Sequence, residues 1–182
     1  MSYNKPNLPM ELSESIIDRL QRGEKKVFKA DGAVYERLSE HMGRFPVVMI
    51  SPADRNLLTD GSDVRRKFMD QTIAQSNPAF LHALICYNRA LSQRNALLKY
   101  FAANRTFDAD TLTLYDDQLC EYAPLIHEAR ERFVEAFVPM LKHNYAQIAG
   151  DEEDVDLRYR SKLHEMSMRN LLTESLAKDR LL

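Results

Sequence analysis

The chain has 182 residues, a net charge of −2 at pH 7, and a composition that is 45% hydrophobic and 29% charged. It has only five glycines, and no two of them lie closer than nine positions. Phosphate-binding loops need closely spaced glycines, because the backbone must approach the phosphates without a Cβ in the way. The P-loop and dinucleotide-binding spacings are both absent, which excludes a self-contained nucleotide site of either kind. The acidic balance argues against a protein that coats DNA generally, although a local basic patch remains compatible with it.

The first residues of the chain predict neither export nor membrane insertion. They lack the apolar core of a signal peptide, and no apolar run approaches the ~20 residues that span a bilayer. The two cysteines, Cys86 and Cys120, predict no disulfide framework and fit a reducing compartment. We therefore expect a cytoplasmic protein with no membrane partner.

The first 50 residues predict a mixture of helix and strand. Residues 1–21 are interpreted as an irregular arm followed by a short helix, because four apolar residues recur there at helical spacing: Leu12, Ile16, Ile17 and Leu20. The alternating residues on both sides of Asp31 and Gly32 have the pattern of a β-hairpin. The apolar run 46–50 predicts a buried strand. Residues 22–50 therefore form a small β portion.

Two short helices are expected after this β portion. Residues 51–54 (Ser-Pro-Ala-Asp) supply a hydroxyl for a helix cap, a proline at the first helical position and a carboxylate near the helix start. They predict a helix that runs to about Thr59. Ser62 is expected to cap a second helix, which the Asn77-Pro78 pair ends.

Two long helices dominate the rest of the chain. The first covers about 78–103, and Asp108 is expected to cap the second. The first carries a heptad seam of seven residues: Phe80, Leu84, Tyr87, Leu91, Arg94, Leu98 and Phe101. The seam of the second is longer: Leu112, Tyr115, Leu119, Tyr122, Ile126, Ala129, Phe133, Ala136 and Met140. The short link makes the two helices antiparallel neighbours. Pro124 and Pro139 predict a kink or break in the second.

The C-terminal residues predict one strand and one helix. Apolar and charged side chains alternate near 155–160, which predicts a half-exposed strand, and a closing helix is expected over about 162–181. The predicted fold class is mainly α, of the α+β type. Residues 51–182 form an elongated antiparallel helical hairpin lobe beside a small β layer.

The sequence predicts neither a catalytic group nor a metal site. His82 and Cys86 lie four apart on one helix, but no second pair at ligand spacing accompanies them. His127 and Glu131 share the second long helix, where pairs of this kind are mostly solvated. A cluster of four aspartates does not match the EF-hand pattern; its members are Asp108, Asp110, Asp116 and Asp117. No serine stands in a nucleophile elbow.

Basic residues supply the clearest candidate for binding. Arg65, Arg66 and Lys67 are adjacent near the start of a predicted helix, so all three cannot face the core. Some of them could meet phosphate, and the alternative is a solvated charged face. Arg89 and Arg94 lie along the first long helix. Arg94 stands inside the apolar seam, where a buried guanidinium would need a carboxylate partner.

Three stretches together resemble one protein family. They are FPVVMISPADRNLLTDGSDVRRKFMD (45–70), YNRALSQRNALLKYF (87–101) and YDDQLCEYAPLI (115–126). They resemble the middle segment of RecF, a bacterial recombination-mediator ATPase with an ABC-type, SMC-like head. The ending SLAKDRLL fits the point where the family's helical lobe returns to the ATPase lobe. The resemblance covers about 22–182 and does not include residues 1–20.

The resemblance implies that this chain is the helical lobe II inserted in the ABC-type head. RecF proteins bind ATP and Mg²⁺, dimerise in the ATP-bound form and bind double-stranded or gapped DNA. With RecR and RecO they help to load the RecA recombinase. The Walker A, signature and Walker B motifs are absent from these 182 residues, so we expect the chain alone to hold no ATP or Mg²⁺ and to hydrolyse no ATP.

Two sets of residues acquire expected roles from the resemblance. The candidates for contacting DNA are Arg65, Arg66, Lys67, Arg89 and Arg94. The candidates for coupling the two lobes, where ABC heads sense the nucleotide, are Ser51, Pro52, Asp54 and Arg55. A plain helix cap is an equally good interpretation of the second set. The alternative for the whole chain is a helical protein-interaction module without DNA binding, which the acidic charge and the two apolar seams also fit.

Overall fold

The computed structural model of the chain describes residues 16–19, 27–30, 33–34, 51–150 and 153–180. The chain divides into two compact units, Met1–Val48 and Met49–Leu182. No helix in the described ranges combines the length and the apolar composition needed to cross a membrane.

The first unit contains a three-stranded antiparallel sheet. Its strands β1 (Ile16–Arg19), β2 (Val27–Ala30) and β3 (Ala33–Val34) lie in the order β1-β2-β3. The predicted hairpin is confirmed, since β2 and β3 pair across a two-residue connection. The predicted short helix is wrong at its centre, because Ile16–Arg19 pairs with β2 as a strand. The two adjacent β-branched isoleucines favour a strand, and this preference outweighs a helical period that rests on so few residues. The expected strand at 46–50 lies outside the described residues.

The second unit begins with short elements. The 3-10 helix η3 (Pro52–Arg55) leads into the one-turn helix α1 (Asn56–Thr59), and α2 (Ser62–Ser76) follows. The predicted helix over 51–59 is therefore present, partly as 3-10 helix. The expected cap at Ser62 is wrong: the helix already includes Ser62, and Gly61 occupies the N-cap position without a side-chain hydrogen bond.

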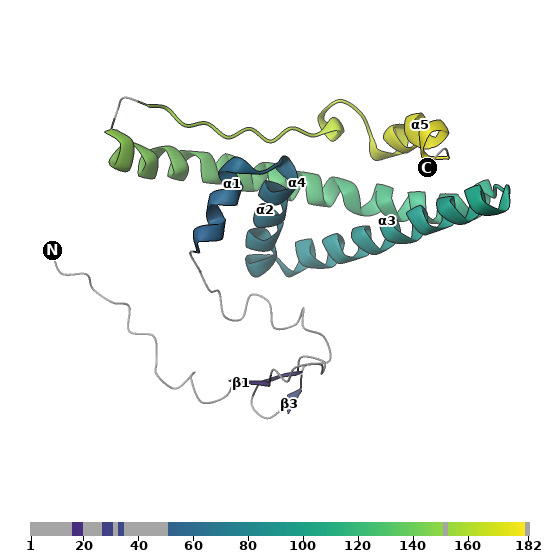
Figure 1. The fold of residues 1–182 in the computed structure, drawn as a ribbon, viewed down its shortest axis with the longest axis horizontal. Coiled ribbons are helices and arrows are strands. Elements are labelled where there is room, and N and C mark those ends of the chain that lie inside the picture. The colour runs from purple at the N-terminus through teal and green to yellow at the C-terminus, as the bar shows by residue number, and fades with distance from the viewer. Residues whose placement is uncertain (1–15, 20–26, 31–32, 35–50, 151–152, 181–182) are drawn as a thin grey trace. The chain divides into compact units, whose positions relative to one another are not determined.

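The predicted helical hairpin is confirmed. Helices α3 (Pro78–Asn104) and α4 (Ala109–Ala149) run antiparallel (Figure 1). Asn77 caps α3, since its side-chain oxygen accepts the Phe80 N–H at 2.9 Å. Asp108 caps α4 by accepting the N–H groups of residues 110 and 111 at 3.0 and 3.2 Å. Arg105 turns the chain between the helices in the left-handed conformation, at φ 52°.

Helix α4 continues through both of its prolines. Pro124 and Pro139 lie inside the helix, so the predicted break does not occur. Both rings are on the exposed side of the helix, and only one intrahelical hydrogen bond is lost at each. Ala123 and Ile126, next to the first proline, are buried on the packed side and hold the helix there. At about 1.5 Å per residue, α4 is about 60 Å long.

The core follows the predicted seams over most of their length. Its buried apolar residues are Met69, Ile73, Ala74, Phe80, Ala83, Ala90, Leu98, Phe101, Leu112, Leu119, Ala123, Ile126, Ala129 and Leu172. The seam of α4 was predicted to reach Met140, but this side chain is 63% exposed. Helix α3 begins at Pro78, so the last part of α4 has no facing helix in the hairpin.

Residues 153–161, here called the strap, run back along α4 (Figure 1). The predicted strand near 155–160 is wrong, because these residues form no strand ladder within the described ranges. The alternation in sequence has another cause: Val155, Leu157 and Tyr159 are partly buried, and the residues between them are exposed. An extended chain that packs on a helix shows the same two-residue period as a sheet strand.

The strap leads through the 3-10 helix η5 (Lys162–His164) into α5 (Met168–Asp179). The closing helix thus starts later than predicted. Helix α5 packs against the hairpin through the buried Leu172. Arg169 pairs with Asp117 of α4 at 2.6 Å, and the Arg180 guanidinium lies 4.2 Å from the centre of the Phe107 ring.

Arg94 joins three helices from inside the seam. It is 3% exposed; its Nε donates to Asp116 of α4 at 2.6 Å and its Nη1 to Asp179 of α5 at 2.7 Å. Burial lowers the pKa of this guanidinium, but the hydrogen bonds and charges of Asp179 and Asp116 outweigh that effect and raise it above the usual value. Arg94 therefore stays charged, and the expected pairing inside the hairpin is confirmed.

A second ion pair fixes α2. The Nε and Nη2 groups of Arg130 on α4 each donate to one carboxylate oxygen of Asp70 at 2.8 Å. Both side chains are less than one-fifth exposed. A two-point contact of this kind fixes direction as well as distance, so it orients α2 against α4.

We predict that Leu119→Ala lowers the free energy of unfolding by about 3 kcal/mol, because the lost side chain leaves a cavity between α3 and α4. Leu119 is 0% exposed. Denaturant titration measures the change. Leu125→Ala is the matched control on the same helix, since Leu125 is 52% exposed. Equal losses in the two variants would contradict the packing described above.

We also predict that Arg94→Ala destabilises the chain by about 3 kcal/mol, because Asp116 and Asp179 are left without their cation. This is the lower end of the usual range, since each carboxylate keeps about a fifth of its surface exposed. Arg89→Ala removes an exposed arginine from the same helix and should change stability by less than about 0.5 kcal/mol. A loss no larger than that of the control would show that the buried pairs contribute little.

Candidate nucleic-acid interface

The three adjacent cations of α2 have different surroundings. All three are exposed, but Arg65 is already engaged. Its Nη1 donates to the backbone carbonyls of Leu57 at 3.0 Å and Asp60 at 2.9 Å. These carbonyls belong to the end of α1 and the turn after it, where helical acceptors lack partners. Arg65 therefore fastens α1 to α2.

Arg66 and Lys67 remain directed to solvent. Arg66 Nη1 donates to the Ser62 hydroxyl at 3.0 Å. Within the described ranges, no carboxylate oxygen lies within 4.0 Å of either cation. Asp70, one turn further along α2, is bound to Arg130 of α4. Both cations are thus available to an anion from outside.

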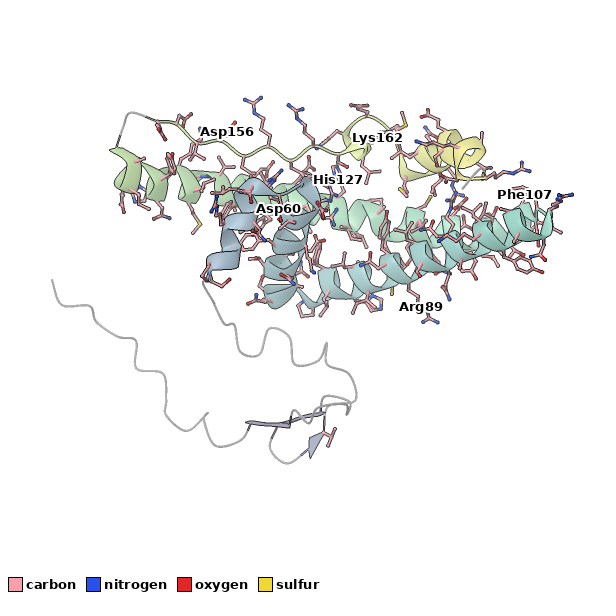
Figure 2. All side chains as sticks on the ribbon, in the orientation of Figure 1. Asp60, Arg89, Phe107, His127, Asp156 and Lys162 are labelled. Carbon is pink, nitrogen blue, oxygen red and sulfur yellow. The ribbon has the colours of Figure 1, made fainter. Side chains whose placement is uncertain are left out.

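The two candidates on α3 differ in exposure. Arg89 is exposed, and Figure 2 shows it projecting from the side of α3 that faces away from α4. Arg94 is buried and bound to two aspartates, so this chain does not present it to a nucleic acid. That candidate is corrected: its position in the seam, four residues before Leu98, places it in the core. Arg66, Lys67 and Arg89 remain from the predicted set.

The candidate coupling segment folds as a closed local turn. The Asp54 carboxylate accepts the Ser51 N–H at 2.7 Å, and the Asp54 N–H donates to the Ser51 carbonyl at 3.0 Å. Pro52 and Arg55 are the ends of η3 and are exposed. The predicted hydroxyl cap is wrong: no hydrogen bond of the Ser51 hydroxyl is found among the described residues, and the Asp54 carboxylate closes the turn instead. The role of Ser51, Pro52, Asp54 and Arg55 between lobes stays a prediction.

The structure brings together a different set of potential metal ligands from the pair that stands out in the sequence. On α3, the Cys86 Sγ lies 3.6 Å from His82 Nε2; Cys86 is half-buried, and the exposed His82 meets the Tyr122 ring of α4 edge to face. A three-residue cluster forms elsewhere, from His127, Glu131 and His164. The sequence showed only its first two members, one helical turn apart. The third is 33 positions further along the chain and reaches them through the strap.

Proteins with similar sequences share one description. No family model matches the chain. The DNA replication and repair protein RecF of Flavobacterium johnsoniae is 48% identical over 170 residues, which cover 93% of this chain and 47% of that protein. The RecF protein of Parabacteroides distasonis is 41% identical over 169 residues (93% and 45%). That of Porphyromonas gingivalis is 45% identical over 166 residues (90% and 44%).

Solved structures give the same result. The structure of the recombination mediator protein RecF with ATP in the RecFOR pathway matches with a TM-score of 0.78 and 27% identity, over 91% of this chain and 46% of that one. A second RecF structure of the same pathway matches with a TM-score of 0.75. The helices described above therefore have the fold of a helical segment of RecF. The chain belongs to the RecF family, and it spans about half the length of the curated relatives that it matches.

Proposed function

We propose that this chain is the helical lobe of a RecF-like DNA replication and repair protein, and that it contacts the DNA backbone. The observation that carries the proposal is the 48% identity to a DNA replication and repair protein RecF along 93% of the chain. Its surface supplies a physical means: Arg66, Lys67 and Arg89 are exposed and have no carboxylate partner within the described residues.

Cations of this kind suit phosphate better than base edges. A Lys or Arg that neutralises a phosphate releases counterions, and the gain does not depend on the base sequence. The net charge of −2 restricts this contact to a local patch. Binding should therefore be salt-dependent and insensitive to sequence.

In the whole protein, the lobe would act under the control of the nucleotide. ATP and Mg²⁺ would bind in the head, and the turn at Ser51–Arg55 would relay their presence to the hairpin. RecR-like and RecO-like mediators, a second RecF copy and DNA, double-stranded or gapped, would be the partners in loading a recombinase. Support comes from the matching structures, which are described as the recombination mediator RecF with ATP in the RecFOR pathway.

We predict that the chain binds duplex DNA with an affinity that falls as salt rises, and that Arg66→Ala, Lys67→Ala and Arg89→Ala together weaken it. Each lost phosphate contact should reduce the slope of log K against log salt by about 0.9. Fluorescence anisotropy with duplex and gapped DNA over a series of salt concentrations measures both quantities.

The matched control removes three cations that already have carboxylate partners: Arg132→Ala, Lys142→Ala and Arg158→Ala. These side chains pair with acidic groups at 3.6, 3.4 and 3.0 Å, and the net charge changes by the same amount. Equal weakening by both triple variants would show a general charge effect and contradict the proposed surface. No DNA binding at low salt, with a RecR-like protein still bound, would favour the protein-interaction module instead.

We predict further that the purified chain shows no ATP turnover, because its sequence has no glycine-rich loop to hold the phosphates. Phosphate release is measured with and without DNA, and a full-length RecF protein serves as the positive control. Turnover that co-purifies with the chain and saturates with ATP would refute this prediction.

A further inference from the structure

Three side chains of types that can bind metals come together where η5 lies against α4. His127 and Glu131 lie one turn apart on α4, and His164 ends η5. One donor atom from each lies within 4.8 Å of the others. Figure 2 shows His127 on α4 beside the part of the chain that carries Lys162.

The distances match the requirements of a small tetrahedral ion. Zn²⁺ binds nitrogen and oxygen at about 2.0–2.2 Å, so two of its tetrahedral ligands lie about 3.3–3.6 Å apart. Glu131 has one carboxylate oxygen 3.7 Å from His127 Nε2 and the other 3.2 Å from His164 Nδ1. The donor atoms of the two histidines lie within 4.8 Å of each other, so they would have to move closer to surround one ion.

Surrounding groups already orient one of the imidazole rings. The Tyr159 hydroxyl lies 3.4 Å from His127 Nδ1, which leaves Nε2 directed at Glu131. A hydrogen bond to the second ring nitrogen is what usually fixes the tautomer and the direction of a metal-binding histidine. The His127 and His164 rings meet edge to face, with their centres 4.7 Å apart.

The cluster is sheltered but open to solvent. His127 is 14% exposed, and Glu131 and His164 are 39% and 37% exposed. A cavity of about 360 Å³ lies beside the two histidines and is also lined by Pro124 and Met166. An ion can enter there, and the cavity leaves room for a water molecule as a fourth ligand.

We propose that His127, Glu131 and His164 bind one Zn²⁺ ion, which fastens η5 and the strap to α4. The two helical ligands and the third from η5 belong to segments that are separate in sequence, so the ion would cross-link them. The site would then fix the start of α5 as well, because Ser167 follows η5 closely and caps that helix. This inference does not depend on DNA binding.

The test is a zinc titration of the tag-free chain after treatment with a chelator. Calorimetry should give one ion per chain. His164→Ala and His127→Ala should each weaken binding by at least about 100-fold, since the loss of an outer partner alone costs about 10–100-fold. Tyr159→Phe should weaken zinc binding by about 10-fold, because His127 loses its outer hydrogen-bond partner. His143→Ala is the matched control, because His143 is an exposed histidine on α4 outside the cluster.

Two further measurements decide between this site and its alternatives. Co²⁺ in place of zinc should give the visible bands of a tetrahedral nitrogen and oxygen site. A thiolate-to-metal band would place the ion on a cysteine, either Cys86 beside His82 or Cys120, which lines the same cavity, and would overturn the proposal. Zinc should raise the melting temperature of the unaltered chain and not that of His164→Ala, while both melt alike without metal. Absence of zinc binding would overturn the proposal, and an equal loss in His143→Ala would show that the metal binds surface histidines in general.

Discussion

The apolar seam between α3 and α4 is the contact on which the rest of the helical unit depends, and its length is limited. Helix α3 begins at Pro78, whereas α4 continues to Ala149. Beyond Phe133, α4 needs other elements to cover it. Helix α2 packs beside the end of the seam through Met69 and Ile73, which cluster with Ile126 and Ala129, and the strap contacts α4 further along, at Lys142 and Tyr145. The unequal arms therefore explain why a helical hairpin is accompanied by two segments that resemble neither arm.

A charged residue inside that seam determines where α5 lies. Arg94 cannot be buried without carboxylates, and α4 supplies only Asp116. Asp179 completes the site from α5, which makes docking of that helix part of the core. Arg94 Nη2 is buried without a hydrogen-bond partner among the described residues, and an unsatisfied buried donor costs free energy. A buried cation that accepts one arrangement of α5 favours specificity over stability.

Local signals allowed most of the helical unit to be predicted, and distant contacts account for its main errors. Asn77 and Asp108 act within three residues of themselves, so the sequence located the starts of both arms of the hairpin. Asp179 lies 85 positions from Arg94, and no periodicity links them. Buried and exposed side chains do alternate along the strap, but the sequence cannot tell whether the chain there packs on a helix or pairs with another strand. The cluster around His164 was missed because His164 lies 33 positions from Glu131 in the sequence.

The adjacent cations of α2 show the limit of a pattern most clearly. Successive residues on a helix point about 100° apart, so Arg65, Arg66 and Lys67 cannot share one environment. Only Arg65 points back toward the end of α1, the helix that directly follows the turn at Ser51–Arg55, and it joins α1 to α2. Asp70 then joins α2 to Arg130 of α4. A displacement of the turn would thus reach the hairpin through two polar contacts. Such contacts couple the turn to the hairpin only if the turn has two arrangements, so the proposed relay depends on a second state of the turn.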